Sequence, residues 1–247
     1  MSTPDSRTVT IDPTRSVTAL HYAAEGDAFA TLVLGHGAGA NQFSAFMTGF
    51  ASAFAARGLH VVTFNFPYTE SARKLPDTKT VLLDCYRAVV RHVAADPVLG
   101  AWPLVIGGKS MGGRMASYLA AAPGPDAVEA AGWWSRLRGL VFLGYPLHPP
   151  ARPQQVRVDH LPAIVHPMLF VQGAKDAFGT PDEIRAFTNV LPARCTLVPV
   201  DQADHSFEVT KRSGIPQADV YARIQDTVVD WIGQTCRGSE FGIRNST

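Results

Sequence analysis

The chain has 247 residues and a formal net charge of +1, and 46% of its residues are hydrophobic against 17% charged. This length and composition exclude a disordered chain and are sufficient for one well-buried α/β core. A charge close to zero gives no electrostatic reason to expect nucleic acid or an anionic membrane as a partner.

The three cysteines, Cys85, Cys195 and Cys236, are scattered and lack the spacing of a metal site. We therefore expect no disulfide framework, no structural zinc and a reducing compartment. The N-terminal sequence MSTPDSRTVT is not a secretory signal, and the longest apolar runs are too short to span a membrane. The sequence predicts a soluble, cytoplasmic protein and leaves its oligomeric state open.

Short apolar runs alternate with longer mixed segments along the chain. The segments 8–11 and 16–23 alternate in polarity, as is typical of half-buried strands near a sheet edge. The other runs are continuously apolar, which indicates strands covered on both faces. They are 31–35 (TLVLG), 59–66 (LHVVTFNF), 103–108 (PLVIGG), 137–144 (LRGLVFLG), 167–173 (PMLFVQG) and 195–200 (CTLVPV).

The segments between these runs have the composition and apolar spacing of helices. Gly58 and Pro123 stand where helices are expected to stop. Strands that alternate with helices predict βαβ units and one α/β sheet, mostly parallel and doubly wound, with helices on both faces. The expected helices are 43–57, 77–95, 111–122, 181–190 and 218–233.

The chain shows no internal repeat and no sign of a second domain. We expect an N-terminal segment over 1–14 and a single α/β domain over 15–236. The remaining 237–247 (RGSEFGIRNST) is polar and aperiodic, and its GSEF resembles a cloning scar. We interpret this tail as disordered, of vector origin and outside the fold.

The stretch GGKSMGGR, over 107–114, admits two interpretations. A phosphate-binding P-loop requires a glycine five residues before Gly108, and that residue is Pro103 in an apparent strand. The pattern G-x-S-x-G requires a strand, a sharp turn at the serine and a helix, and this context is present around Ser110. The second interpretation is favoured, with Ser110 as a nucleophile.

A serine hydroxyl needs a base to accept its proton, and the base needs an acid to orient it. In a fold with this turn, the acid and then the histidine follow in loops after later strands. Asp176 follows the strand 167–173, and His205 follows the strand 195–200. Asp176 is therefore the predicted acid and His205 the predicted base, with Asp201 and Asp204 as weaker alternatives for the acid.

The tetrahedral intermediate of such a reaction needs donors for its oxyanion. The backbone N–H of Met111, just after the nucleophile, is one predicted donor. The other is predicted from the loop GHGAGA after the strand 31–35, at Ala38, with Gly39 as the next choice. His36 in this loop is expected to stabilise it by hydrogen bonds rather than to act as a base.

The motifs GHGAGA, GGKSMGGR, QGAKDAFG and ADHSF together resemble the α/β-hydrolase superfamily over roughly residues 15–235. The chain is similar to small, nearly lidless members related to dienelactone hydrolases and short-chain carboxylesterases. It carries Ser110 where the dienelactone enzymes carry cysteine. The KSMGGR form also resembles a branch that includes proteins of chromatin complexes, in which a hydrolase-like domain serves as a scaffold.

The resemblance implies a carboxylesterase-like serine hydrolase that cleaves small esters of short to medium acyl chains through an acyl-enzyme on Ser110. This chemistry requires neither a metal nor an organic cofactor. The segment 145–166 is short and rich in proline, which favours an open site without a lid. Thioesterase or lactonase activity, other chemistry of the same residues and a non-catalytic scaffold stay as alternatives.

Several residues near the motifs are candidates for the substrate pocket, although each also suits the core or the rim. They are Gly39, Phe43, Tyr145, Phe178 and Phe207. Arg114 is expected to form a structural ion pair, with a substrate carboxylate as the alternative. The basic residues Arg73, Lys74 and Lys79 are expected to be solvated, with an acidic substrate group as the alternative.

Overall fold

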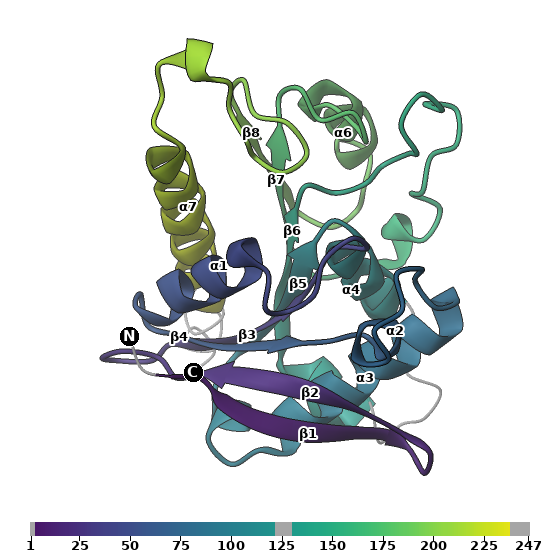
Figure 1. The fold of residues 1–247 in the computed structure, drawn as a ribbon, viewed down its shortest axis with the longest axis vertical. Coiled ribbons are helices and arrows are strands. Elements are labelled where there is room, and N and C mark those ends of the chain that lie inside the picture. Colours follow the sequence, from purple (N-terminus) through teal and green to yellow (C-terminus); the bar gives the residue numbers. More distant parts are fainter. Residues whose placement is uncertain (1–2, 122–129, 238–247) are drawn as a thin grey trace, which may run out of the picture.

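The computed structural model describes residues 3–121 and 130–237, and its centre is an eight-stranded sheet (Figure 1). The strand order is β1-β2-β4-β3-β5-β6-β7-β8. Strand β2 is antiparallel to β1 and to β4, and every later pair of neighbours is parallel. The strands are β1 (Asp5–Asp12), β2 (Arg15–Tyr22), β3 (Ala30–Gly35), β4 (Leu59–Phe64), β5 (Leu104–Lys109), β6 (Leu137–Leu143), β7 (Met168–Gly173) and β8 (Cys195–Val200).

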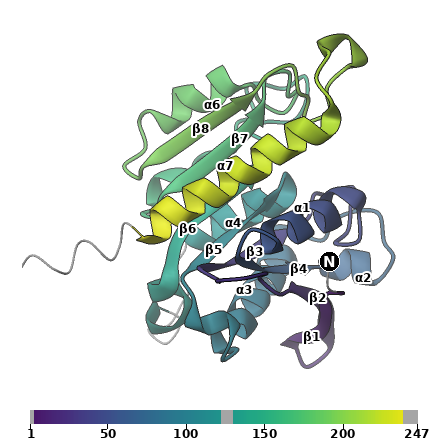
Figure 2. The same ribbon diagram turned by 90° about the vertical axis from the view of Figure 1, so that its left-hand side faces the viewer.

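Helices cover both faces of the sheet (Figures 1 and 2). One core cluster joins α1 and α7 to the sheet, and the other joins α3, α4 and α6 to the opposite face. This arrangement is the doubly wound α/β sheet that the alternating pattern predicted. The helices are α1 (Ala45–Ala55), α2 (Pro67–Glu70), α3 (Lys79–Ala95), α4 (Met111–Ala121), α6 (Pro181–Thr188) and α7 (Gln217–Arg237), with short helical turns η1 (Leu99–Ala101), η2 (Ala130–Trp134), η3 (Leu161–Ala163) and η4 (Lys211–Ser213).

Local signals explain where several of these helices begin and end. Ser44 caps α1, with its hydroxyl accepting from the N–H of Met47. A capping box between Thr180 and Glu183 starts α6. Gly58, just after α1, has a φ of 86°, and an added Cβ would lie 2.9 Å from the carbonyl oxygen of Asp27. Helix ends therefore follow from residues that can be recognised in the sequence.

Strand β8 differs from the expectation of a strand covered on both faces. Every residue of β8 is half-buried or exposed, whereas β3, β4 and β7 are fully buried. The reason is that β8 is the last strand of the sheet and pairs only with β7. Its apolar sequence CTLVPV therefore belongs to an edge, where Pro199 is tolerated.

The ends of the chain differ in part from the expected divisions. The segment 1–14 contains β1, which pairs with β2 and completes the sheet. The tail was predicted over 237–247, but its first residue, Arg237, is the last residue of α7, and the rest of it, 238–247, lies outside the described residues. The last residue of the predicted helix 111–122 lies outside them as well.

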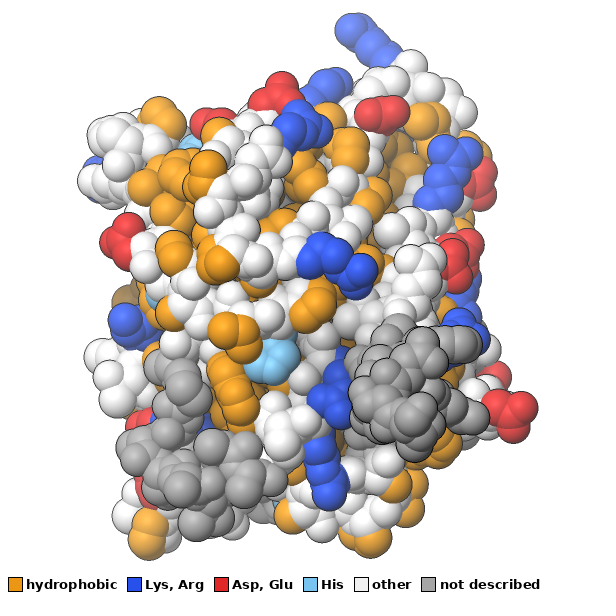
Figure 3. All heavy atoms as spheres, turned by 180° about the vertical axis from the view of Figure 1, so that it is seen from behind, with side chains coloured by type: hydrophobic (Ala, Val, Ile, Leu, Met, Phe, Trp, Pro, Cys, Tyr) orange, Lys and Arg blue, Asp and Glu red, His pale blue; other side chains and the backbone are white. Residues whose placement is uncertain are grey.

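The described residues contain no helix that is long and apolar enough to cross a membrane. Within residues 3–121 and 130–237 there is also no group of three His, Cys, Asp or Glu side chains placed to hold a metal ion. The face in Figure 3 shows basic and acidic side chains dispersed among polar and apolar ones, in keeping with the net charge of +1.

Candidate active site

The predicted nucleophile Ser110 lies at a sharp turn between β5 and α4. Its φ of 50° is in the left-handed region, which a residue other than glycine rarely adopts. The Ser110 N–H donates to the carbonyl of Leu143 on β6 at 3.0 Å, and the Ser110 carbonyl accepts from the N–H of Arg114 at 3.1 Å. These bonds hold the strained turn and leave the serine half-exposed.

The glycines around Ser110 are required by close backbone contacts. A Cβ on Gly112 would lie 2.1 Å from the carbonyl oxygen of Gly35, at the end of β3. A Cβ on Gly108 would lie 2.4 Å from the same oxygen. Strand β5 extends to Lys109, so the stretch before Ser110 is strand and not the loop that a P-loop needs.

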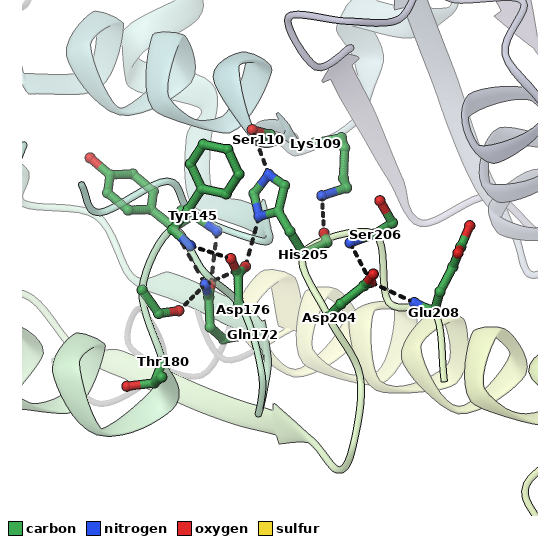
Figure 4. A network of polar contacts seen from close by, with 12 residues as sticks. Lys109, Ser110, Tyr145, Gln172, Asp176, Thr180, Asp204, His205, Ser206 and Glu208 are labelled. Atoms are coloured by element: carbon green, nitrogen blue, oxygen red, sulfur yellow. Dashed lines mark hydrogen bonds and ion pairs between the residues drawn. The ribbon is translucent and has the colours of Figure 1, made fainter. Parts of the chain in front are cut away.

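The three residues predicted for nucleophilic chemistry lie in one hydrogen-bonded chain (Figure 4). The Ser110 hydroxyl lies 2.9 Å from His205 Nε2, and His205 Nδ1 lies 2.7 Å from Asp176 Oδ2. Because an ionised carboxylate can only accept, Nδ1–H is the donor to Asp176 and Nε2 is left to accept from Ser110. The arrangement suits His205 to receive a proton from the serine.

The carboxylate of Asp176 is fully buried and has three donors. Its Oδ2 accepts from His205 and from Gln172 Nε2 at 2.8 Å, and its Oδ1 accepts from the N–H of Phe178 at 2.8 Å. Gln172, on β7, also accepts from the N–H of Tyr145 at 2.8 Å and donates to the carbonyl of Gly179 at 2.7 Å. Gln172 therefore fixes the orientation of the acid relative to its loop.

The two alternative acids do not contact His205. Asp204 Oδ1 accepts from the N–H groups of Ser206 and Glu208, at 2.8 and 2.9 Å, and so stabilises the turn that carries His205 (Figure 4). Asp201 is exposed in the turn after β8. The geometry therefore agrees with the choice of Asp176 over both.

Lys109, to which the sequence assigned no role, links the serine turn to the histidine loop. Its ammonium group donates to the carbonyl of His205 (Figure 4) and lies 5.2 Å from the centre of the Phe207 ring. Burial lowers the pKa of Lys109 to about 8, although the charges of Asp176 and Asp204 act in the opposite direction. The residue before the nucleophile thus holds the backbone of the predicted base.

The loop after β3 carries Ala38 next to Ser110. Ala38, Ser110 and Met111 line the same cavity. Met111 is the first residue of α4, so its N–H has no acceptor within the helix. The carbonyl of Ala38 accepts from the hydroxyl of Tyr68 at 2.9 Å, which fixes the orientation of the Ala38–Gly39 peptide. Both residues predicted to supply oxyanion donors therefore line the cavity beside Ser110, and the bond from Tyr68 orients the peptide that carries the N–H of Gly39, the next choice.

His36 is fully buried and makes hydrogen bonds that hold this loop. Its Nδ1 lies 2.8 Å from the carbonyl of Gly37, and its Nε2 accepts from the N–H of Phe66 at 3.2 Å. Burial lowers the pKa of His36 to about 4. A neutral imidazole bonded at both nitrogens is suited to the structural role that was expected of it.

Ser110 opens into a cavity of about 380 Å³ between α3, α4 and the segment after β6. Among the predicted pocket residues, Phe178 lines this cavity, and its ring centre lies 4.3 Å from that of His205. Gly39 lines a neighbouring hollow on the other side of Ala38. The cavity is lined by Ala38, Pro76, Asp77, Lys79, Leu82, Ser110, Met111, Arg114, Met115, Tyr118, Pro146, Arg157 and Phe178.

Three predicted pocket residues lie elsewhere. Tyr145 is fully buried against Phe142, and its hydroxyl donates to the carbonyl of Arg157 at 3.0 Å, behind the cavity wall. Phe207 is fully buried in the core beside α1. Phe43 is 58% exposed and does not line the cavity. Proximity to a strand end does not determine which way a side chain turns, and here two of them turn into the core.

For other residues that line the cavity, the sequence predicted a different role or no role. Arg114 was expected to form an ion pair, yet among the described residues no carboxylate pairs with it. Arg157 and Tyr118 were not singled out, because nothing in their local sequence marks them. The position of Arg114 in the first turn of the helix that follows Ser110 was the available signal.

Solved structures with the same architecture fall in one class. A serine hydrolase homologue from Coxiella burnetii superposes with a TM-score of 0.69 at 17% identity, covering 93% of this chain and 98% of that one. A dienelactone hydrolase from Anabaena variabilis gives 0.71 at 17% identity, covering 95% and 99%. A serine hydrolase without lid from Xanthomonas campestris gives 0.64 at 20% identity, covering 94% and 96%. The fold is that of an α/β hydrolase.

The sequence leads to the same class independently of these superpositions. Residues 28–233 match the family described as alpha/beta hydrolase domain. The match covers most of the chain, including the loop at Ala38, the turn at Ser110 and the loops of Asp176 and His205. The protein belongs to this family of hydrolases.

Proposed function

We propose that the protein is a carboxylesterase-like serine hydrolase with Ser110, His205 and Asp176 as its catalytic triad. The observation that carries this proposal is the continuous hydrogen-bonded chain from the Ser110 hydroxyl through His205 to the buried Asp176. These residues come from loops at the carboxyl ends of three parallel strands, where α/β sheets place their ligand sites.

The reaction proceeds in two steps through an acyl-enzyme. In the first, Ser110 Oγ attacks the ester carbonyl while His205 Nε2 takes its proton, and Asp176 stabilises the charged imidazole. The N–H groups of Met111 and Ala38 bind the oxyanion, with each donor contributing about 3 kcal/mol. His205 then returns the proton to the leaving alcohol as the C–O bond breaks.

The second step hydrolyses the acyl-enzyme. His205 Nε2 removes a proton from water, the resulting hydroxide adds to the acyl carbon, and the oxyanion again occupies the donors at Met111 and Ala38. Collapse of this intermediate expels Ser110 Oγ, which recovers its proton from His205. The acid product leaves, and neither step requires a metal or an organic cofactor.

The substrates proposed are small esters of short to medium acyl chains. A cavity of about 380 Å³ is within the range of small-molecule sites, and Ser110 is half-exposed rather than covered by a lid. The segment 145–166 contributes Pro146 and Arg157 to the cavity wall. Thioesterase and lactonase activity use the same machinery and are the alternative chemistry.

The setting proposed for this activity is the cytoplasm. Cys85, Cys195 and Cys236 are free thiols, as suits a reducing compartment. We also propose that 15–236 acts as one hydrolase domain, with β1 added to its edge. A non-catalytic scaffold on this fold is the competing proposal. A scaffold would not require the hydrogen bond between Ser110 and His205.

The test compares initial rates on p-nitrophenyl esters from acetate to palmitate for the wild type and for Ser110→Ala. We expect short esters to be hydrolysed and Ser110→Ala to lose about a thousandfold or more in kcat, because the nucleophile is gone. His205→Ala should lose a similar factor. The matched control Ser206→Ala changes the neighbouring exposed serine and should keep the wild-type rate.

Labelling with a serine-directed fluorophosphonate separates the enzyme from the scaffold. The proposal predicts one modified residue, Ser110, in the folded protein. A folded wild type that is neither labelled nor active on any ester, or a Ser110→Ala variant with the full wild-type rate, would contradict the proposed function.

A further inference from the structure

The cavity beside Ser110 is unusually rich in positive charge for an ester pocket. Three cationic side chains line it, Lys79, Arg114 and Arg157, against a single carboxylate, Asp77. Asp77 Oδ1 accepts from Arg73 at 2.6 Å, and its Oδ2 is buried without a hydrogen-bond partner. The lining therefore has an excess of positive charge that its own carboxylate does not neutralise.

Of the three cations that line the cavity, Arg114 is the nearest to Ser110 along the chain. It lies four residues after Ser110, in the first turn of α4, and both residues line the cavity. Its Nε is buried and has no hydrogen-bond partner, and no described carboxylate pairs with it. Buried guanidinium donors normally have an acceptor. The free Nε–H of Arg114 is therefore available to an acceptor on a bound ligand.

Arg157 and Lys79 complete the positive lining from two other elements. The backbone of Arg157 is fixed, because its N–H donates to Leu147 at 2.8 Å and its carbonyl accepts from the hydroxyl of Tyr145 at 3.0 Å. Lys79 begins α3, and its ammonium group lies 4.5 Å from the centre of the Tyr118 ring. Three rigid elements thus present cations to one cavity.

The electrostatics of the neighbouring groups reflect this charge. Burial lowers the pKa of Arg157, and the charge of Arg114 lowers it further. Burial lowers the pKa of His160 to about 4, with additional contributions from Lys79 and Arg114. The cations therefore repel one another and disfavour the protonated form of nearby groups. A bound anion would offset this repulsion.

We propose that this cavity binds a carboxylate of the substrate, so that the preferred substrates are half-esters of short dicarboxylic acids. This inference rests on the proposed function, because it places the scissile ester at Ser110 and the free carboxylate at Arg114 and Arg157. The planar guanidinium fork matches a carboxylate with two parallel hydrogen bonds. The preferred dicarboxylic acid is the one whose two carboxyl groups are separated by the distance from Ser110 to the two guanidinium groups.

The test compares monoethyl adipate with ethyl hexanoate, two esters of the same acyl length of which only the first carries a carboxylate. We expect kcat/KM to be roughly 10-fold or more higher for the half-ester, as for a charge-assisted hydrogen bond. Arg114→Gln and Arg157→Gln should each bring the ratio of the two values towards one. Arg152→Gln, which changes an exposed arginine of the same segment outside the cavity, should leave it unchanged.

A binding measurement tests the carboxylate site without catalysis. Isothermal titration of adipate into Ser110→Ala should show saturable binding that is weakened roughly 10-fold by adding Arg114→Gln and unaffected by adding Arg152→Gln. Competition with inorganic phosphate distinguishes a carboxylate site from a general anion site. We expect phosphate to displace adipate poorly, and equal displacement would overturn the carboxylate assignment.

The two proposals fail in different ways. Hydrolysis of ethyl hexanoate by Ser110 with no preference for monoethyl adipate would overturn the carboxylate site and leave the esterase intact. Adipate binding that depends on Arg114, in a protein that hydrolyses no ester, would support the site and contradict the esterase. Circular dichroism of each variant establishes that it is folded before its ratio or affinity is compared.

Discussion

Lys109 links the two halves of the site, the turn at Ser110 and the loop of His205. Its ammonium group holds the carbonyl of His205, while its backbone is the last residue of β5 and adjoins Ser110. A hydrogen bond from a charged donor contributes about 1.5–3 kcal/mol. Lys109 is therefore a positioning residue whose loss affects the relation of the base to the nucleophile.

We expect Lys109→Met to lower kcat by about 10- to 100-fold with little change in KM, because the bond to His205 is lost while the cavity is unchanged. The wild-type rate should also fall as the pH rises through about 8, the pKa of this amine, because the neutral amine is a weaker donor. That decline should be absent in Lys109→Met. Steady-state kinetics between pH 6 and 10 measure both effects.

Lys211→Met is the matched control, since Lys211 is exposed in the helical turn η4 before α7. It should retain the wild-type kcat and pH profile. A Lys109→Met variant with an unchanged kcat and an unchanged alkaline decline would show that the His205 loop is held by its other contacts alone.

The strands and the helix around the site pack with their backbones in direct contact. The end of β3 and the start of α4 touch at Gly35 and Gly112, and Gly108 meets the same carbonyl from β5. Side chains at these positions would separate β3 from α4 and move Ser110 relative to Ala38. The geometry of the proposed oxyanion donors thus depends on packing between elements rather than on either loop alone.

We expect Gly112→Ala to destabilise the protein by about 2–4 kcal/mol and to lower kcat, because the added Cβ would lie 2.1 Å from the Gly35 carbonyl oxygen. Gly49→Ala is the control. Gly49 lies in α1 with open space around it, so alanine there should be neutral or stabilising by up to about 1 kcal/mol. Urea unfolding gives both values, and equal stability of the two variants would contradict the expectation.

Much of the site could be predicted from the sequence because its marks are local. Ser110 lies in a glycine-rich turn, and Asp176 and His205 each follow an apolar run within five residues of its end. The burial of β8 could not be predicted, since an apolar run does not say which strand ends the sheet. The cavity wall formed by Arg157 could not be predicted either, because Arg157 joins Ser110 at the cavity only through tertiary packing.

The sequence also could not predict in which direction a side chain near a strand end points. Tyr145 and Phe207 stand next to strand ends and turn into the core, whereas Phe178 in a similar position turns to the cavity. Gln172 was hidden within an apolar strand, although a buried amide in such a run signals a polar partner nearby. That signal points to Asp176, four residues later.

At the scale of the whole molecule, buried histidines couple stability to pH. Burial lowers the pKa of His36 and of His160 to about 4, and it also lowers that of His21, His60 and His166. In the unfolded chain a histidine titrates near pH 6.5. Between these values the unfolded chain binds more protons than the native one, so stability is full above about pH 6.5 and is lost as the pH falls.

We expect the free energy of unfolding to decrease between pH 7 and pH 5, with His36 alone contributing about 2 kcal/mol of the loss. Urea unfolding at a series of pH values measures the slope. His36→Asn should show a smaller slope, whatever its stability at pH 7. A stability that does not change between pH 7 and pH 5 would be incompatible with buried neutral histidines.

The order of the site residues along the chain has a consequence for synthesis. Ser110 follows the central strand β5, whereas His205 follows the edge strand β8, the last of the described strands along the chain. A ribosome-bound chain that ends before β8 has its nucleophile but nothing to deprotonate it. On the proposed mechanism, the hydrolase is silent until β8 and the His205 loop that follows it have been synthesised and added to the sheet.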